Sequence, residues 1–555
     1  MSRNKLMAGV FLLFTIPSFL FGCTHKVKNK VLSEKLKEKI EVLQDDIQLM
    51  DSVHIYNPDI IAQLYQLSGK LMSAKWSNRK NIDQLLEFIR QVDQEGLNPE
   101  DYHLTLIENL TSKIVTEKKA TLEEIADFEL ILTDAFLTLS SHLAGGKLDA
   151  ETIDPQWKAI RRNLDVQWEV FIDSTLRYNK VKETLDRLTP NHQEYNNLVK
   201  ALLKYKTIEA QGGWDVFTTS LKKIEPGTEH PDIVKLRARL SVTQGVIEPD
   251  STNENRYDQT LFDQVVIFQV RNGLKGDGVI GKQTIEALNV PVGDRIASIE
   301  ANLERWRWLS DDLGERYIMV NIANFDLQLI DNGKQVFATE AIVGRPYRMT
   351  PVFSSLMTYL VLNPDWTVPP TILKNDVIPE VIKNSNYLIE KGMKVLTMDG
   401  KEVNASAIDW NRAAKSGFPY MIRQEPGKLN ALGKVKFMFP NQHNVYIHDT
   451  PSRNLFTQTD RGFSSGCIRV NRPIELAALL LADLPVWTPQ QIDQVLNQGK
   501  PRTVNLPKPI PVHLLYMTAW ADGDGTVYFR KDIYNRDQPL LLALKQQYEH
   551  NTDEL

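Results

Sequence analysis

The spacing of hydrophobic residues changes from a helical to a strand period near Arg316, just past the middle of this 555-residue chain. Before that point apolar residues share one face of a helix, as in the stripe Ile125, Phe128, Leu132, Phe136, Leu139 and Leu143. After it Ile318, Val320 and Ile322 alternate, which is typical of a half-buried strand. No single helical bundle or sheet accommodates both periods. The sequence therefore predicts a multidomain α+β protein, and its length is that of about three or four domains.

The first half divides into two helical regions. Residues 35–228 predict a helical scaffold domain, in which Gly145-Gly146 closes the stripe. Residues 229–294 predict a smaller domain with Asp258 as a helix N-cap, a tight glycine turn and a short helix from about Lys282 to Leu288. Residues 295–315 predict a connecting helix, whose tryptophans are expected to pack rather than to bind ligand.

The second half predicts a mostly β domain over residues 316–490. The D-N-G run at 331–333 indicates a hairpin. Residues 371–422 interrupt the strands with helical signals, and an excursion of this length inside a sheet is usually functional. Residues 491–555 predict a proline-rich entry, two strands joined by a D-G turn and a short helix, packing back on the scaffold and catalytic body.

The position of one cysteine predicts a catalytic thiol. The chain has two cysteines, Cys23 near its start and Cys467 within S-S-G-C-I-R-V, nineteen residues after His448. A thiol can attack an acyl carbon when a nearby histidine accepts its proton. The small residues before Cys467 would let backbone N–H groups hold an oxyanion, and Arg469 would share the side of the strand with the thiol. The alternative is that Cys467 is a small buried hydrophobe, as single cysteines often are.

The full motif is more specific than the Cys–His pair and resembles that of the L,D-transpeptidase family. The matching residues are Tyr446, His448, Ser464, Ser465, Gly466, Cys467 and Arg469. Many members of the family carry histidine where this chain has Ser465. The resemblance implies that Cys467 is the nucleophile and His448 the base, oriented by a main-chain carbonyl, with Asp449 as a weaker candidate for that role. It also implies that Gly466, Ser465, Arg469 and Tyr446 contact the oxyanion or the substrate.

Other segments extend this resemblance to the large periplasmic subgroup. L-T-D-A-F-L-T-L-S-S-H-L-A-G-G-K-L-D resembles its scaffold domain, residues 229–294 resemble a three-helix peptidoglycan-binding domain, and 371–422 its capping lid. The implied reaction is acyl transfer through a cysteine thioester on peptidoglycan tetrapeptide stems, releasing D-alanine and forming 3→3 cross-links. Peptidoglycan stem peptides and glycan are the expected partners of a monomer, with no cofactor and no metal. A cysteine peptidase or amidase and a non-enzymatic wall-binding protein remain alternatives.

The N-terminus predicts export. Residues 1–23 combine Arg3 and Lys5 with a short apolar run and end in L-F-G-C, which resembles a lipobox with Cys23 as the lipidated residue. An uncleaved membrane anchor is the alternative, and residues 24–34 form a linker in either case. We expect a periplasmic protein tethered to the membrane, with the outer membrane favoured. The net charge of −5 and pI of about 6.1 give no electrostatic case for nucleic acid.

Overall fold

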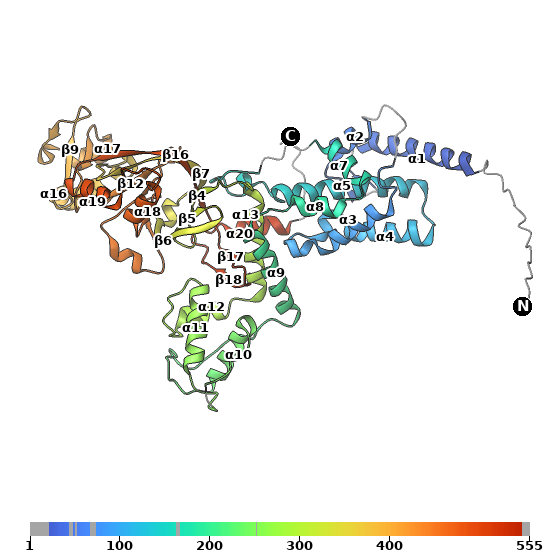
Figure 1. Ribbon diagram of the computed structural model, residues 1–555, viewed down its shortest axis with the longest axis horizontal. Helices are drawn as coiled ribbons and strands as arrows, with labels where there is room; N and C mark the ends of the chain where they lie inside the picture. The colour runs from blue at the N-terminus through green and yellow to red at the C-terminus, as the bar shows by residue number, and fades with distance from the viewer. Residues whose placement is uncertain are drawn as a thin grey trace, which may run out of the picture.

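The computed structural model describes residues 21–43, 48–49, 53–66, 74–162, 167–250 and 252–546, and these residues form three lobes (Figure 1). One lobe is helical and contains α1 to α8, a second contains α10 to α12, and the third contains the large sheet. Two long helices, α9 (Gln193–Ala210) and α13 (Val292–Trp308), pack against each other where the lobes meet. The predicted multidomain α+β class is confirmed.

The helical lobe is built around α5, which is buried on almost every side. Thr121 and Glu124 form a capping box at its start, so two backbone N–H groups that the helix leaves unpaired are satisfied. The helix ends at Gly145, and Gly146 follows with a φ of 95° that only glycine adopts without strain. The helices of this lobe are α1 (Phe21–Leu43), α2 (Pro58–Gln66), α3 (Arg79–Gln91), α4 (Leu104–Thr111), α5 (Leu122–Gly145), α6 (Ala150–Ile153), α7 (Trp168–Arg177) and α8 (Val181–Leu188).

The second lobe has three helices, α10 (Asp232–Gln244), α11 (Gln259–Arg271) and α12 (Lys282–Leu288). The Asp258 side chain accepts a hydrogen bond from the Leu261 N–H, which confirms the predicted N-cap. The bounds of α12 confirm the predicted short helix. Buried side chains from all three helices form a core separate from those of the other lobes.

Helix α13 is buried between lobes and does not run as an exposed linker. Trp306 and Trp308 are 3% and 4% exposed, as packing residues should be. Arg307 and Glu304 form a fully buried ion pair with Nη1 and Oε2 2.7 Å apart. The other Glu304 oxygen accepts the Leu148 N–H at 2.8 Å, so this carboxylate joins α13 to the end of the scaffold.

The sheet of the third lobe closes on itself. Its strands run in the order β12-β13-β15-β6-β5-β4-β16-β7-β3, and β12 pairs again with β7. The predicted hairpin joins β5 to β6, with Asn332 at a φ of 48° and Gly333 at 71°, as a two-residue turn between twisted strands requires. The bounds are β3 (Trp157–Lys158), β4 (Arg316–Asn321), β5 (Asp326–Asp331), β6 (Lys334–Gly344), β7 (Val352–Leu362), β12 (Val435–Met438), β13 (Ile447–His448), β14 (Gly462–Ser464), β15 (Ile468–Val470) and β16 (Arg502–Leu515), and β14 lies off this path on β6.

The C-terminal segment differs from its prediction, because it does more than pack back on the body. Strand β16 lies inside the sheet between β4 and β7. Its proline-rich half, up to Pro511, pairs only with β7 and breaks register between Asn505 and Ile510. The residues Val512 to Leu514 pair on both sides, and Leu515 pairs with β4 alone. Prolines at a bulge and on an unpaired edge cost the ladder no hydrogen bonds, which is how a proline-rich strand fits here.

The insertion is also less helical than predicted. It contains α14 (Pro370–Ile372), α15 (Ile378–Lys383), α16 (Tyr387–Glu390) and α17 (Trp410–Ser416), but also a four-stranded sheet of its own. That sheet consists of β8 (Trp366–Thr367), β9 (Met393–Leu396), β10 (Glu402–Val403) and β11 (Met421–Gln424). A small apolar core joins the helices to this sheet, so the insertion is a compact unit.

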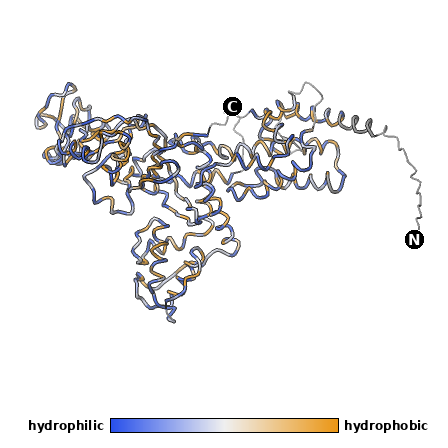
Figure 2. Tube along the Cα trace, viewed as in Figure 1, coloured by the Kyte–Doolittle hydropathy of each residue, from blue (hydrophilic) through white to orange (hydrophobic). Residues whose placement is uncertain are grey.

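Hydrophobic stretches occur in all three lobes (Figure 2), in agreement with separate apolar clusters. Among the described helices, none is both long and apolar enough to cross a lipid bilayer. Most of the predicted leader, residues 1–20, lies outside the described residues. Cys23 falls in the first turn of α1, but its side chain is outside what the structure describes.

Candidate active site

The predicted site residues lie on two neighbouring strands of the closed sheet. Strands β13 and β15 are parallel, with Ile447 opposite Ile468 and His448 opposite Arg469. This register places Tyr446 opposite Cys467, one position earlier on each strand. Since side chains alternate along a strand, Tyr446 and His448 share one face with Cys467 and Arg469. Cys467 and His448 are therefore diagonal neighbours on one face.

A backbone carbonyl fixes the orientation and the tautomer of the His448 imidazole. The residue is 4% exposed, and its Nδ1 lies 2.5 Å from the Asp449 main-chain oxygen. Because a carbonyl only accepts, Nδ1 carries the proton and Nε2 is left as the basic nitrogen. Burial, with the nearby positive charge of Arg469, lowers the pKa of His448 to about 3. The imidazole is therefore neutral at ordinary pH.

The orienting acceptor is the Asp449 carbonyl, while the Asp449 carboxylate has a different task. That carboxylate accepts the Lys434 N–H at 2.7 Å and the Thr450 N–H at 2.6 Å, and it pairs with Arg453. These contacts hold the chain on both sides of His448 in place. The family expectation of a main-chain carbonyl thus describes this histidine, and the carboxylate supports it indirectly.

Cys467, a partly exposed residue, lies on the same face. Its Sγ lies 3.9 Å from the Asn444 carbonyl oxygen. Burial raises the pKa of the Cys467 thiol, whereas contacts to Tyr446 and the charges of Lys436 and Arg469 act in the opposite direction. The sulfur is thus protonated at neutral pH, beside a neutral imidazole. A thiol in this state needs a base at the moment of attack.

Two side-chain hydroxyls hold the turn that carries the thiol. The Ser464 hydroxyl accepts the Gly466 N–H at 3.1 Å and donates to the Cys467 carbonyl at 2.6 Å. The Thr350 hydroxyl donates to the Gly466 carbonyl at 2.9 Å. Gly466 has a φ of 114°, a conformation that strains any other residue. The Gly466 N–H is thus already engaged, and among the described residues no acceptor contacts the Cys467 N–H.

Ser465 is exposed and connects the thiol turn to the insertion. The Arg348 guanidinium donates to the Ser465 hydroxyl at 2.9 Å and pairs with Asp376 of the insertion at 2.5 Å. Arg348 itself lies in a short 3₁₀ turn after β6. One arginine therefore connects the turn that carries Cys467 to the insertion.

Positive charge around the thiol is not balanced by carboxylates. Arg469 forms no ion pair in the part of the chain that the structure describes, and its buried Nε has no hydrogen-bond partner there. Lys436 on β12 lies directly opposite His448, with its Nζ 4.0 Å from the centre of the Tyr446 ring. Burial lowers the pKa of Lys436, and burial likewise lowers that of Arg469. Among the described residues Arg469 therefore has no salt bridge through which it would shape the loop.

Sequence reasoning missed Lys436 and Arg348. Lys436 stands between Val435 and Phe437, so the alternation of a strand predicts that its side chain points away from the core. The sequence does not predict which strand lies beside it. Trp366 on β8 acts to lower the pKa of the Tyr446 hydroxyl, against the larger effect of burial, so its indole lies at the site.

Comparisons with known proteins match two separate parts of the chain. Residues 59–202 match the family described as scaffold domain, and residues 315–492 match the L,D-transpeptidase catalytic domain. The chain combines a scaffold domain with an L,D-transpeptidase catalytic domain. A curated protein of Haemophilus influenzae named "Putative L,D-transpeptidase" is 34% identical over 275 residues, which cover 49% of this chain and 55% of that protein. The chain thus spans about half the length of this relative.

Solved structures are more distant from the chain. An L,D-transpeptidase from Mycobacterium smegmatis is 12% identical with a TM-score of 0.17, covering 36% of this chain and 58% of that one. An L,D-transpeptidase from Xylanimonas cellulosilytica is 14% identical with a TM-score of 0.16, covering 54% and 100%. Likenesses at this level carry no argument about the site.

The match to the L,D-transpeptidase catalytic domain includes both strands of the site and the whole insertion. It ends before β16, although β16 completes the same sheet. In the described part of the chain, no group of three or more histidine, cysteine or carboxylate side chains could hold a metal ion.

Proposed function

We propose that this chain is a cysteine L,D-transpeptidase that acts on tetrapeptide stems of peptidoglycan through a thioester on Cys467. The observation that carries the proposal is the parallel register of β13 and β15. It puts the thiol of the partly exposed Cys467 and a buried, neutral imidazole on one face of the sheet, with Nδ1 of that imidazole fixed by a carbonyl.

The first step is proton transfer coupled to attack. His448 Nε2 takes the thiol proton as Sγ bonds to the carbonyl carbon that joins the third stem residue to the terminal D-alanine. The imidazolium then returns this proton to the leaving amine, so D-alanine departs and a thioester remains. An acceptor amine, typically the side chain of a neighbouring stem, next loses its proton to His448 and takes the acyl group. Both halves use the same base, and the thiol is regenerated.

The tetrahedral intermediates are anions, and the site offers them positive partners. The Cys467 N–H is the backbone donor left for the oxyanion, and such a donor contributes about 3 kcal/mol, or on the order of 100-fold in rate. Tyr446 remains protonated because burial raises its pKa, so its hydroxyl is a second donor beside the sulfur. The unpaired Arg469 guanidinium suits a substrate carboxylate, which it can bind with two parallel hydrogen bonds.

The test is incubation of purified protein with disaccharide tetrapeptide, followed by mass spectrometry. We expect cross-linked dimer together with free D-alanine, and a mass increase on Cys467 that is absent from Cys467→Ala. Tripeptide without dimer would identify a hydrolase instead. A fully active Cys467→Ala variant would leave only a wall-binding protein.

We further propose that the protein works in the periplasm as a monomer, tethered through acylated Cys23. This rests on the apolar run and L-F-G-C at the N-terminus. Intact mass spectrometry of the exported protein tests it. A diacylglyceryl mass on a chain beginning at Cys23 is expected, whereas a chain that retains residues 1–22 would mean an uncleaved anchor.

A further inference from the structure

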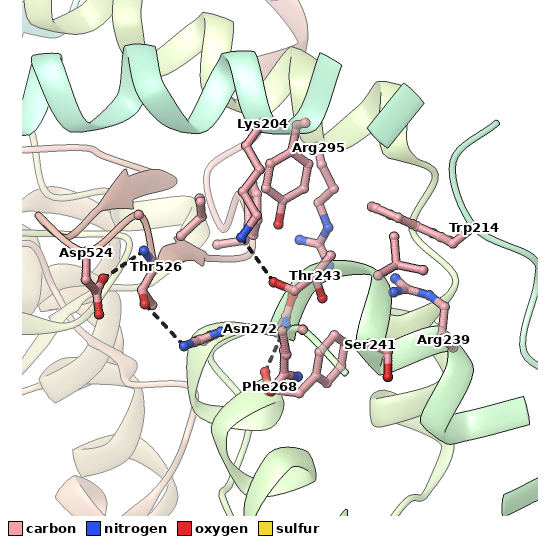
Figure 3. A pocket seen from close by; sticks show the side chains of 18 residues that line it. Lys204, Trp214, Arg239, Ser241, Thr243, Phe268, Asn272, Arg295, Asp524 and Thr526 are labelled. Carbon is pink, nitrogen blue, oxygen red and sulfur yellow. Dashed lines mark hydrogen bonds between the residues drawn. The ribbon is translucent and has the colours of Figure 1, made fainter. Parts of the chain in front are cut away.

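A cavity of about 470 Å³ lies away from the thiol, where three parts of the chain meet (Figure 3). Its walls come from α9, from α10 and α11 of the second lobe, and from the hairpin of β17 (Ala519–Ala521) and β18 (Val527–Phe529). This volume is in the range of pockets that bind small molecules, about 300–1,000 Å³. Neither Cys467 nor His448 lines it.

The lining carries an excess of positive charge. Lys204, Arg239, Arg271 and Arg295 all face the cavity, against one carboxylate, Asp524 on the exposed hairpin turn. Within the described chain none of these four cations forms an ion pair with a carboxylate. Lys204 donates to the Thr243 carbonyl at 3.1 Å and Arg271 to the Thr526 hydroxyl at 3.2 Å, and both acceptors are neutral.

Two of the guanidinium groups are desolvated. Arg239 is 6% exposed; its Nε donates to the Leu288 carbonyl at 2.8 Å, and its buried Nη1 has no partner among the described residues. Its guanidinium lies 4.0 Å from the centre of the Trp214 ring, and that of Arg295 lies 4.4 Å from the Phe529 ring. Burial is the main cause that lowers the pKa of each arginine to about 10, and repulsion from Arg295 contributes to the lowering at Arg239.

Such an arrangement costs free energy in the absence of a ligand. A buried cation without a counter-ion is one of the more unfavourable features of a folded protein, and an unsatisfied guanidinium N–H adds to it. An anion in the cavity would remove both penalties. A guanidinium presents a planar pair of donors that matches a carboxylate, and the aromatic walls suit the apolar part of a ligand.

We propose that this cavity binds a carboxylate-bearing peptide, namely the acidic stem of a peptidoglycan strand other than the one reacting at Cys467. The identity of the peptide rests on the proposed function, whereas the preference for a carboxylate rests on the cavity itself. Its position between the second lobe and the C-terminal hairpin gives the second lobe a role in holding the polymer. This binding is separate from the acyl-transfer chemistry.

The experiment uses the full-length chain with Cys467→Ala, so that the ligand is not consumed. Isothermal titration calorimetry compares a tetrapeptide stem with free carboxylates, the same peptide with its carboxylates amidated, and inorganic phosphate. The cavity variant combines Lys204→Gln with Arg271→Gln, because these two side chains are the more exposed and each gives up one hydrogen bond to a neutral acceptor. Lys222→Gln is the matched control, an exposed lysine outside the lining. Arg469→Gln marks binding at the thiol site.

We expect the cavity variant to weaken binding of the free-acid peptide at least tenfold, with the control unchanged and the amidated peptide bound weakly by every form. In an otherwise wild-type chain, the cavity variant should keep the turnover of a small soluble donor and acceptor within twofold. Arg239→Met, with calorimetry to verify its fold, should weaken peptide binding in the same way. Any one of three results would overturn the proposal. The cavity variant could bind the free-acid peptide as tightly as the control does. The protein could bind the amidated peptide, or inorganic phosphate, as tightly as the free-acid peptide. If Arg469→Gln loses turnover but its cavity binds the peptide as before, the binding site in the cavity is separate from the site at Cys467.

Discussion

Replacing Ser464 with alanine tests whether the thiol is held by the serine that precedes the turn. Ser464 is 2% exposed, and its single hydroxyl satisfies both the Gly466 N–H and the Cys467 carbonyl. Each of these groups, once unsatisfied in a buried turn, costs about 1–3 kcal/mol. The expected loss of stability for the two groups together is therefore roughly 2–6 kcal/mol.

Ser465→Ala is the matched control, because it changes the same atoms one residue along the chain. Its exposed hydroxyl accepts only from Arg348, so the loss should stay near or below about 1 kcal/mol. For a domain of this size, about 2–4 °C of melting temperature corresponds to 1 kcal/mol. Scanning calorimetry should therefore show a drop of roughly 4–24 °C for Ser464→Ala and a few degrees at most for Ser465→Ala.

The same two serine variants also test whether Ser464 affects the reaction rate by positioning the thiol, apart from its effect on stability. If Ser464 fixes the thiol, Ser464→Ala should also lower kcat in the muropeptide assay at temperatures where it is fully folded, by roughly tenfold for about 1.4 kcal/mol. The reasoning is refuted if the two serine variants melt together, or if Ser464→Ala melts lower but turns over at the wild-type rate.

Three further perturbations have defined outcomes. Lys436→Gln should slow alkylation of Cys467 by iodoacetamide and shift its rise with pH upward, because the charge of Lys436 favours the thiolate, while Lys436→Arg should retain most of the rate. His448 has a folded pKa of about 3 against an ordinary value of about 6.5, so the unfolded state binds this proton first as the pH falls. Stability should thus be lost from about pH 6.5 down to about pH 3, and His448→Gln should flatten that slope by up to about 1.4 kcal/mol per pH unit in urea titrations. Arg307→Met should cost about 3–5 kcal/mol by leaving Glu304 buried and unpaired, and replacing both residues with methionine should recover much of it.

Local patterns made much of the fold predictable. Asp258 capping α11 and the D-N-G hairpin each depend on a few neighbouring residues, so the sequence alone is enough to predict them. The Cys467 and His448 assignment came from a motif whose spacing reflects two short strands and the loop between them. The alternation of Tyr446 with His448, and of Cys467 with Arg469, also predicts which side each residue takes on its own strand.

Pairing between distant strands was not predictable in this way. β16 reads as a proline-rich tail, and only its neighbours β4 and β7 show that its second half completes the sheet. Similarly, Trp157 in the scaffold pairs with Val352 of β7, and no local sequence pattern predicts this pairing. Lys436 was missed for the same reason, since its importance comes from lying opposite His448 on another strand.

The charges around Cys467 make sense only for a reacting site. In the resting state the thiol and the imidazole are both neutral, and among the described residues neither Lys436 nor Arg469 forms an ion pair with a carboxylate. Each is partly desolvated, which weakens its interaction with water and strengthens its interaction with any anion that arrives. A substrate supplies that anion twice, first as a carboxylate and then as the oxyanion formed by attack. Arg348 connects two parts of the structure. Its hydrogen bond to Ser465 and its ion pair with Asp376 link the turn that carries Cys467 to the insertion. A substrate carboxylate at this site would give the unpaired Arg469 guanidinium a negative partner and so offset its desolvation.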